Sequence, residues 1–442
     1  MARGEDAGSP HAVSGEVSSD AAAHGADAAA QAPGTTVRCL LVTSIFAPIN
    51  GGSAVVYENL CRYGPAGSMQ ALAPTHHYET GEALEGWREH DKRAPFKVHR
   101  LALLRPLARR HRSRLLKLAL WLGSDLPLRA RVLWAAMRIV RRERIDVVCI
   151  GELVSGAWLG LALKRVLGTR LIFYIHGEEV TTVTPYRFYG RRRKQHLARA
   201  DAVVAVSGFT RQALIELMDV ADDKIALIYN GVDLARFSPG PRNPALLRRY
   251  ALDGKQVLLT VGRLVPRKGI DTTIRALPAL LDTFPDLHYL VVGRGPYRAD
   301  LEALAAELGV SRHVSFAGGV PDDELVDHYR LCDLFVMPNR ELANHDTEGF
   351  GLVFLEANAC GKPVIGGRAG GVVEAVRDGQ NGLLVDGDDV AALERTIASV
   401  LGDAAFADAL ATRGLAIAQA SGWESRAQQF NRLCARLLRG QG

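Results

Sequence analysis

The stretch EGFGLVFLEANACGKPVIGG, residues 348–367, contains the pattern that decides the fold. Gly349 and Gly351 surround the predicted start of a helix over 350–360, in which Phe350, Phe354 and Ala357 recur at helical spacing. Gly361 then ends the helix, and the short apolar run PVIGG follows as a predicted strand. A helix leading directly into an apolar strand is one half of a βαβ unit, so the stretch indicates a parallel α/β sheet.

The same alternation extends in both directions from this stretch. One series of apolar runs predicts strands at 37–44, 70–74, 96–101, 146–150, 171–176, 202–207 and 225–230. A second series predicts strands at 257–262, 288–293, 314–318, 334–338, 363–367 and 382–385. Helical patterns lie between them, at 155–167, 208–218, 269–283, 297–308, 322–331, 350–360, 388–402 and 423–438. Two successive series predict two facing, doubly wound, Rossmann-like α/β domains with a cleft between them.

Domain bounds follow from this alternation and from the length of 442 residues. We expect a first domain over 37–232, a Pro- and Gly-rich linker over 233–253 and a second domain over 254–420. The final segment, 421–442, predicts a helix that packs back on the first domain. Hydrophobic residues make up 48% and charged residues 23% of the chain, which excludes collagen-like and wholly disordered classes.

Residues 1–36 differ from the rest in composition and charge. They contain one arginine against five acidic residues and no Leu, Ile, Phe, Tyr or Trp, which predicts a disordered acidic tail. This tail has no apolar core of a signal peptide, and no charge-free apolar run in the chain is long enough to span a membrane. Six cysteines are scattered singly, which favours buried free thiols over a zinc or redox site. Together these features predict a cytoplasmic protein.

The positive charge is concentrated in residues 105–144. Twelve Lys or Arg residues stand there against Asp125 and Glu143, interleaved with apolar runs such as LLKLALWL, and a second basic cluster follows at 189–199. A basic amphipathic helix of this kind can bind an anionic membrane surface, so we expect peripheral attachment to the inner face of the cytoplasmic membrane. A solvated helix face over the core is the alternative. Nucleic acid is not an expected partner, because no recognition motif accompanies the charge.

Two loops that follow predicted strands carry groups suited to anions. Gly51 and Gly52 precede a helix start after the first strand, where backbone N–H groups can approach a ligand, although such a turn is equally often only a tight connection. Arg263 and Lys268 flank Pro266 on the loop after the first strand of the second series. Two cations at that spacing can converge on one diphosphate, the arginine as a fork and the lysine as a point charge.

Glu348 and Glu356 are separated by seven residues in the opening stretch. If the segment between them is mostly helical, eight steps of about 1.5 Å place the carboxylates roughly 12 Å apart. That distance suits hydroxyl groups on the two sugars of a nucleotide-diphosphate sugar, with the diphosphate over the helix N-terminus. Without further context, a helix-dipole partner and a surface glutamate would be the favoured explanation of the pair.

Taken together, these motifs resemble the retaining glycosyltransferases of family 4, which have the two-domain GT-B fold. The resemblance rests on GGSAVV, HGEE, VSGFT, NGVDLARFSP, VGRLVPRKGID, EGFGLVFLEANACGKPVIGG and GGVVEAV. It runs from about Val37 to the helix that contains Trp423. The chain is therefore identified as a hexosyltransferase that moves a sugar from a nucleotide-diphosphate donor, GDP-mannose or a UDP-sugar, to a lipid, lipid-linked or glycan hydroxyl in cell-envelope or polysaccharide synthesis.

The resemblance also implies roles for single residues. Arg263 and Lys268 would hold the donor diphosphate, Glu348 the transferred sugar and Glu356 the ribose hydroxyls, while His176 would lie beside the transferred sugar. Without the resemblance, a strand-end histidine with satisfied hydrogen bonds would be the favoured interpretation of His176. The resemblance implies a catalytic set of His176, Arg263, Lys268 and Glu348. The remaining donor-binding positions are backbone or helix-start residues, namely Gly51, Gly52, Arg294, Gly319, Gly349, Phe350, Gly351 and Leu352. No cofactor and no metal is implied, since the two cations can neutralise the diphosphate.

Two departures from the family pattern limit what the resemblance implies about the donor. Gly177 stands where some branches carry Asp after the histidine, so any donor discrimination attached to that Asp is lost. The segment 339–347 is longer than in many members and resembles the branch of phosphatidylinositol mannoside mannosyltransferases, which favours GDP-mannose. A transferase with a soluble small-molecule acceptor, a non-catalytic nucleotide-sugar-binding protein, and a GT-B epimerase or phosphorylase remain alternatives.

Overall fold

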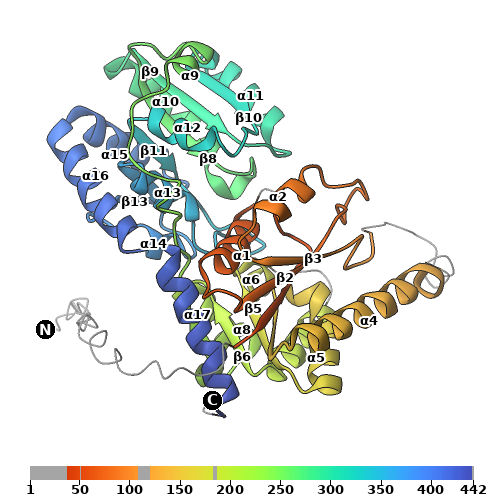
Figure 1. Cartoon of the computed structure of the whole chain (residues 1–442). Coiled ribbons are helices and arrows are strands. Elements are labelled where there is room, and N and C mark those ends of the chain that lie inside the picture. The colour runs from red at the N-terminus through yellow and green to blue at the C-terminus, as the bar shows by residue number, and fades with distance from the viewer. Residues whose placement is uncertain (1–36, 50, 108–119, 183–186, 441–442) are drawn as a thin grey trace, which may run out of the picture. The chain divides into compact units, whose positions relative to one another are not determined.

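The computed structural model describes residues 37–49, 51–107, 120–182 and 187–440, and Val37–Gly442 form one compact unit (Figure 1). The predicted acidic tail, 1–36, lies outside the described residues. So does 108–119, the central part of the basic stretch. The side chains of 187–190, at the start of the second basic cluster, are also outside the description.

The first sheet is parallel throughout and has seven strands in the described residues. Its order is β3-β2-β1-β4-β5-β6-β7. The strands are β1 (Cys39–Val42), β2 (Met69–Pro74), β3 (Lys97–Leu101), β4 (Val147–Ile150), β5 (Arg170–Ile175), β6 (Ala202–Ala205) and β7 (Ile225–Leu227). The strand order reverses between β1 and β4, which marks the switch point where such sheets bind ligands beyond the carboxyl ends of their strands.

Helices connect these strands on both faces of the sheet. They are α1 (Gly52–Tyr63), α2 (Trp87–Arg93), the π-helical turn η2 (Trp121–Asp125), α4 (Leu126–Glu143), α5 (Leu153–Leu167), α6 (Glu178–Thr181), α7 (Arg187–Ala198), α8 (Gly208–Met218) and the 3-10 turn η3 (Asp222–Lys224). Within β1, Cys39 and Leu41 belong to one hydrophobic core cluster, whereas Leu40 and Val42 belong to another. Because successive strand residues point to opposite faces, both faces of the sheet are covered.

The second sheet repeats this topology with six parallel strands in the order β10-β9-β8-β11-β12-β13. These strands are β8 (Gln256–Val261), β9 (Leu287–Val292), β10 (Val314–Gly318), β11 (Leu334–Met337), β12 (Val364–Gly367) and β13 (Leu383–Val385). Its helices and turns are α9 (Pro244–Arg249), η4 (Pro266–Lys268), α10 (Ile270–Thr283), α11 (Arg298–Glu307), η5 (Ser311–His313), α12 (Leu325–Leu331), α13 (Leu352–Ala359), α14 (Val372–Ala375), α15 (Val390–Gly402), α16 (Ala404–Gln419) and α17 (Trp423–Leu438). Two doubly wound parallel sheets confirm the predicted fold class, that of GT-B proteins.

Each of these strands overlaps a run predicted from the sequence. For the central strands, such as β1 and β4, the reason is that runs buried on both faces are continuously apolar. Several bounds in the second half of the chain differ from the predictions, for example in α12, which begins at Leu325 rather than at residue 322. Helix α13 begins at Leu352 rather than at residue 350, since Gly351 adopts the left-handed conformation (φ 95°) and ends the irregular segment before it. The predicted linker 233–253 also contains a short helix, α9, which Asn243 caps by accepting from the Ala245 N–H.

The last helix of the chain, α17, packs against α1 of the first half (Figure 1). Trp423 at its start is buried, and the backbone of Val232 pairs with that of Gly422 just before it. Its buried positions, which include Ala427, Phe430 and Cys434, follow a helical period and face the core. None of the helices in the described residues is long and apolar enough to cross a membrane.

Candidate active site

The loop after β8 places two of the predicted cations near one carboxylate. Lys268 lies in the turn η4, and its Nζ donates to Glu348 Oε2 at 2.5 Å. Only 10% of the Lys268 side chain and 17% of the Glu348 side chain are exposed. Arg263, on the same loop, also attracts the Glu348 carboxylate electrostatically. The structure therefore brings Arg263, Lys268 and Glu348 together, as the sequence predicts.

The charge state of Glu348 results from opposing effects. Burial is the largest single influence and by itself would raise the pKa of this carboxyl group. Lys268, Arg267 and Arg263 together outweigh burial and lower the pKa below its ordinary value. Glu348 is therefore ionised at neutral pH and can accept hydrogen bonds from hydroxyl groups.

Arg267 is a third cation at this site, and sequence reasoning missed it. Its guanidinium Nη1 donates to both oxygens of Asp346 at 3.1 Å, and its side chain is largely buried. The signal for it was present in the PRKG sequence, because Arg267 is adjacent to Lys268. Neighbours on a loop usually point apart, however, so only the fold shows that both side chains turn towards the segment 346–348.

The segment that leads into α13 contacts the first half of the chain. A Cβ atom at Gly349 would lie 1.8 Å from the carbonyl oxygen of His176, so only glycine allows this approach. Nearby, Gly52 at the start of α1 approaches the Leu352 side chain, whose Cδ1 would be 3.9 Å from a Cβ at Gly52. These contacts bring Gly52, His176, Gly349 and Leu352 together. A Cβ at Gly51 would meet no described atom within 4 Å.

A second contact between the two halves involves the predicted GGVVEAV and VSGFT motifs. The carboxylate of Glu374, in α14, accepts from the backbone N–H groups of Gly208 at 2.7 Å and Phe209 at 2.9 Å. These donors are unpaired groups at the N-terminus of α8, where a negative charge is favoured. Both motifs thus serve to join the halves beside the site.

His176 follows β5 directly and is held by two different groups. Its backbone N–H donates to Glu179 Oε2 at 3.2 Å, and its Nε2 lies 2.9 Å from the hydroxyl oxygen of Tyr57. Burial lowers the pKa of the imidazole to about 4 and raises the pKa of the Glu179 carboxyl to about 7. His176 is therefore neutral at pH 7. Tyr57, which sequence reasoning missed, lies inside α1 and looks like an ordinary core residue.

Glu356 lies inside α13, buried, and accepts from the Tyr329 hydroxyl at 2.7 Å. Burial raises its pKa, and the Tyr329 hydrogen bond and Arg236 offset part of that rise. The predicted spacing of about 12 Å from Glu348 assumed a mostly helical segment, and that assumption is wrong. Residues 348–351 are irregular because the helix begins only at Leu352. Phe350 in this segment packs against Tyr229, with ring centroids 6.1 Å apart.

Arg294 and Gly319 meet at the carboxyl ends of β9 and β10. The Arg294 Nε would lie 2.8 Å from a Cβ atom at Gly319. The neighbouring loops are joined in turn, since the N–H of Leu264 donates to the Arg294 carbonyl at 3.0 Å and the N–H of Gly293 donates to the Gly318 carbonyl at 2.8 Å. The loops after β8, β9 and β10 therefore form one continuous edge that carries Arg263 and Arg294.

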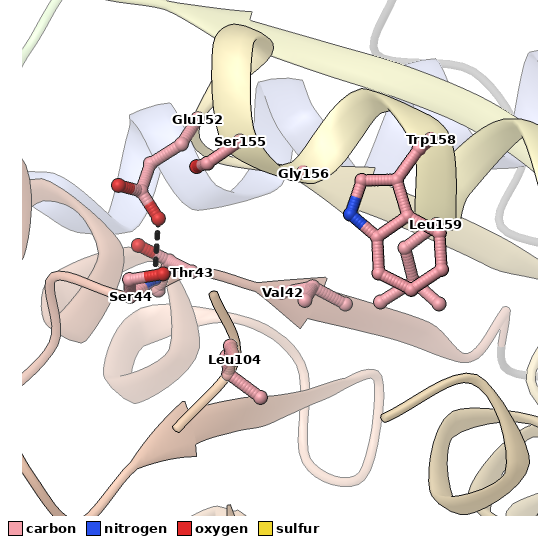
Figure 2. Close-up of a pocket in the computed structure, with 9 residues that line it drawn as sticks. All are labelled: Val42, Thr43, Ser44, Leu104, Glu152, Ser155, Gly156, Trp158 and Leu159. Carbon is pink, nitrogen blue, oxygen red and sulfur yellow. Dashed lines mark hydrogen bonds between the residues drawn. The ribbon is translucent and has the colours of Figure 1, made fainter. Parts of the chain in front are cut away.

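A separate small pocket lies at the switch point of the first sheet (Figure 2). Its volume is about 10 Å³, which is space for one water molecule rather than a sugar. Glu152 lines it and accepts from the backbone N–H of Ser44 at 2.5 Å, while Arg105 approaches the same carboxylate at 3.5 Å. In the described residues, no group of three or more His, Cys, Asp and Glu side chains is arranged to hold a metal ion.

Comparison with known proteins agrees with this geometry. The family model described as "Glycosyl transferases group 1" matches residues 246–415, and "Glycosyltransferase Family 4" matches 71–236. The GDP-mannose-dependent alpha-(1-6)-phosphatidylinositol monomannoside mannosyltransferase of Mycolicibacterium smegmatis is 39% identical over 280 residues, covering 63% of this chain and 72% of that relative. The chain belongs to glycosyltransferase family 4.

Other relatives of this family-4 glycosyltransferase differ in the acceptor that they name. The D-inositol 3-phosphate glycosyltransferase of Nocardia farcinica is 38% identical over 239 residues, covering 52% of this chain and 51% of that protein. Among solved structures, sucrose-phosphate synthase of Thermosynechococcus elongatus matches with a TM-score of 0.72 and 24% identity over 91% of this chain and all of that one. HepE of Anabaena, in complex with UDP and glucose, matches with a TM-score of 0.71 and 21% identity over 90% and 99%. These last two likenesses show the GT-B fold.

Proposed function

We propose that this family-4 glycosyltransferase is a retaining hexosyltransferase that transfers mannose from GDP-mannose to a hydroxyl group of a lipid acceptor in cell-envelope synthesis. The observation that carries the proposal is the cluster around Glu348, in which one ionised carboxylate is surrounded by Arg263, Arg267 and Lys268. The cluster brings three cations together beside the carboxylates Glu348 and Asp346, with Glu178 also acting on Arg267. Gathered cations of this kind suit the diphosphate of a nucleotide sugar.

In the proposed reaction, the bond between the sugar and the donor phosphate breaks. Negative charge then develops on the leaving diphosphate and positive charge on the sugar ring, so fixed cations at the phosphate stabilise the transition state. Lys268 and Arg263 supply those cations from one loop, where Lys268 is buried and paired with Glu348 and Arg263 is exposed. Preorganised charges of this kind need little rearrangement during the reaction.

In the proposed reaction the anomeric configuration is retained, because the acceptor hydroxyl attacks the sugar on the same face that the phosphate leaves. The departing phosphate oxygen takes the acceptor proton, so no pair of catalytic carboxylates is required. Glu348 accepts from a hydroxyl of the transferred sugar, and Glu356 from the ribose. His176 lies beside the transferred sugar. The backbone at Gly52, Gly349, Gly351 and Leu352 frames the diphosphate, with Gly51 adjacent, and Arg294 with Gly319 frames the base. These groups chiefly position the reactants and exclude water.

The choice of GDP-mannose over a UDP-sugar rests on the relatives. Three relatives that name GDP-mannose, from Mycolicibacterium smegmatis, Mycobacterium tuberculosis and Corynebacterium glutamicum, are 32–39% identical over 72–78% of their own length. The structure that contains UDP is only 21% identical. A UDP-sugar remains the second donor to test. Because the three cations can neutralise the diphosphate by themselves, we expect turnover to persist in EDTA, and complete loss there would contradict this part of the proposal.

A lipid acceptor is supported by the outer face of η2 and α4 together with the relatives' names. Val132, Ala136 and Val140 bury one side of α4 against the core. On the described residues, nine large apolar side chains are exposed, and four of them lie on this one segment: Trp121, Leu122, Leu126 and Trp134. Trp134 is 63% exposed, and a surface hollow of about 450 Å³ is lined by it together with Met137, Arg138, Arg141 and Arg142.

Exposed tryptophans beside arginines are typical of a helix that lies in a membrane interface. We therefore propose that α4 attaches the enzyme peripherally to an anionic membrane at the inner face of the cytoplasmic membrane. A double variant, Arg138→Glu with Arg141→Glu, should lose flotation with anionic liposomes at low salt. The matched control changes Arg395 and Arg432, which are exposed on α15 and α17, to Glu. Equal flotation of the two double variants would contradict attachment through α4.

The decisive experiment incubates the full chain with a panel of nucleotide sugars and extracted inositol lipids, and identifies the product by mass. We expect one added hexose on a lipid, from GDP-mannose, and NMR of the product should show the anomeric configuration of the donor. Transfer only to a soluble inositol phosphate would favour the soluble-acceptor alternative. Donor binding without any transfer would favour a non-catalytic nucleotide-sugar-binding protein.

A further inference from the structure

Three residues from three different segments form a buried hydrogen-bonded chain below the site. The Tyr57 hydroxyl, in α1, donates to the carbonyl oxygen of Gly151, which follows β4. The same hydroxyl oxygen lies 2.9 Å from Nε2 of His176, which follows β5. The Tyr57 side chain is completely buried. A Cβ atom at Gly151 would lie 2.5 Å from the Tyr57 ring, so glycine is needed there for the hydroxyl to reach the carbonyl.

The numbers of hydrogen-bond donors and acceptors decide which group donates in the bond between Tyr57 and His176. A tyrosine hydroxyl has one proton to donate, and a backbone carbonyl can only accept. The Tyr57 proton is therefore committed to Gly151, and Tyr57 can only accept from His176. Nε2 of His176 must carry a hydrogen atom. Because the imidazole is neutral at pH 7, its other nitrogen, Nδ1, has a free lone pair, and it makes no hydrogen bond to any described residue.

We propose that Tyr57 is a positioning residue that holds His176 as the Nε2–H tautomer, so that Nδ1 accepts a hydrogen bond from a hydroxyl group of the transferred sugar. The second half of this statement rests on the proposed function, which places His176 beside that sugar. The first half depends only on the hydrogen bonds among Tyr57, Gly151 and His176. The neutral ring offers the sugar an acceptor, which complements a hydroxyl donor and would not complement a phosphate oxygen.

Tyr174 supplies a matched control in the same place. Its ring lies 5.4 Å from that of His176 and 5.9 Å from that of Tyr57, and it is equally buried. Its hydroxyl, however, makes no hydrogen bond to any described residue. Tyr174→Phe and Tyr57→Phe thus remove the same atom from neighbouring positions, and only Tyr57→Phe removes a hydrogen-bond partner of His176.

The tautomer is measured directly by two-bond ¹H–¹⁵N NMR on full-length protein labelled with ¹⁵N-histidine at neutral pH. The His176 signals are assigned as those that disappear in His176→Gln. We expect a protonated Nε2 and an unprotonated Nδ1 in the wild type and in Tyr174→Phe, and a shift towards a mixture of tautomers in Tyr57→Phe. A protonated Nδ1 with a bare Nε2 in the wild type would overturn the proposal, even if Tyr57→Phe failed to fold.

Kinetics test the link to the sugar separately. Tyr57→Phe should lower kcat/KM by about five- to tenfold, the worth of one hydrogen bond, and Tyr174→Phe should leave it unchanged. Donor analogues that each lack one sugar hydroxyl should identify one hydroxyl that contacts His176. Removing that hydroxyl should lower kcat/KM strongly in the wild type and much less in His176→Ala. If no position shows this coupling, the sugar contact is wrong. If no donor is turned over at all, the proposed function fails, whereas the NMR result still decides the tautomer.

Discussion

Lys268 and Glu348 form a buried ion pair, with 2.5 Å between Nζ and Oε2, although 80 residues separate them in the sequence. The lysine comes from the loop after β8 and the glutamate from the segment before α13. Because the cations around Glu348 keep it ionised, the pair fixes a positive and a negative charge side by side, as the proposed function requires for the diphosphate and the sugar.

Replacing Lys268 with methionine should reduce both stability and activity. It leaves the buried Glu348 charge without its hydrogen-bonded partner, so the free energy of unfolding should fall by about 3 kcal/mol. Losing a cation at the leaving group should lower kcat/KM by on the order of 100-fold. Adding Glu348→Gln should restore much of the stability but not the turnover. Denaturant unfolding and initial rates measure these effects, and an inactive but fully stable single variant would contradict the ion pair's structural role.

Gly349→Ala should be disruptive although it adds only one carbon. Its Cβ would lie 1.8 Å from the His176 carbonyl oxygen, so the contact between the two halves must open. Overpacking of this kind costs about 1–3 kcal/mol, and we expect a lower Tm together with a lower kcat/KM. The control is Gly123→Ala, where a Cβ would meet no described atom within 4 Å. Equal Tm values for the two variants would show that the contact between Gly349 and His176 is not maintained.

Tyr329→Phe should change the pH dependence of donor use. The Tyr329 hydroxyl donates to Glu356, which lowers the pKa of that carboxyl against the rise caused by burial. Removing the hydroxyl should raise the pKa, so Glu356 becomes protonated at a higher pH and accepts less well from the donor. The acidic limb of kcat/KM for the donor should move to higher pH, with little change on the alkaline side. An unmoved acidic limb would indicate that Glu356 does not bind the donor.

His90 and Glu58 predict a pH-dependent contribution to stability. His90 Nε2 pairs with Glu58 at 2.7 Å, which raises the pKa of the histidine above 6.5, while the pKa of Glu58 is lowered because His90 and Arg62 outweigh its burial. The histidine's contribution is complete below its unfolded pKa and is lost as the pH rises through the folded value. The glutamate's contribution is lost as the pH falls through its lowered value.

The variant His90→Gln tests the pair of His90 and Glu58. This variant should be less stable than the wild type by about 2 kcal/mol just below pH 6.5, and by progressively less in alkaline solution. Urea unfolding at several pH values measures the difference. A pH-independent loss of stability would mean that packing of the His90 ring, which lies 6.0 Å from the Phe46 ring, accounts for the effect instead.

Local sequence determined the strands and the two parallel sheets, and it indicated the candidate residues of the site. Strands such as Val147–Ile150 are buried on both faces, so their composition is visible without knowledge of their neighbours. The pairing of Arg263 and Lys268 on one loop is equally local. The start of α13 was predicted two residues too early, because the left-handed conformation of Gly351 delays the helix until Leu352.

Tertiary structure alone decided what those residues contact. Tyr57 and Tyr329 carry no local signal, because a buried tyrosine has the same apolar environment whether its hydroxyl is unpaired, as in Tyr174, or bonded to another side chain, as in Tyr57. Arg267 stands in the PRKG sequence, but only the fold shows which way its side chain turns. The approach of Gly349 to His176 likewise joins positions 173 residues apart. Hydrogen bonds and close contacts depend on distances in space, and the chain determines these only after both sheets have formed and packed together.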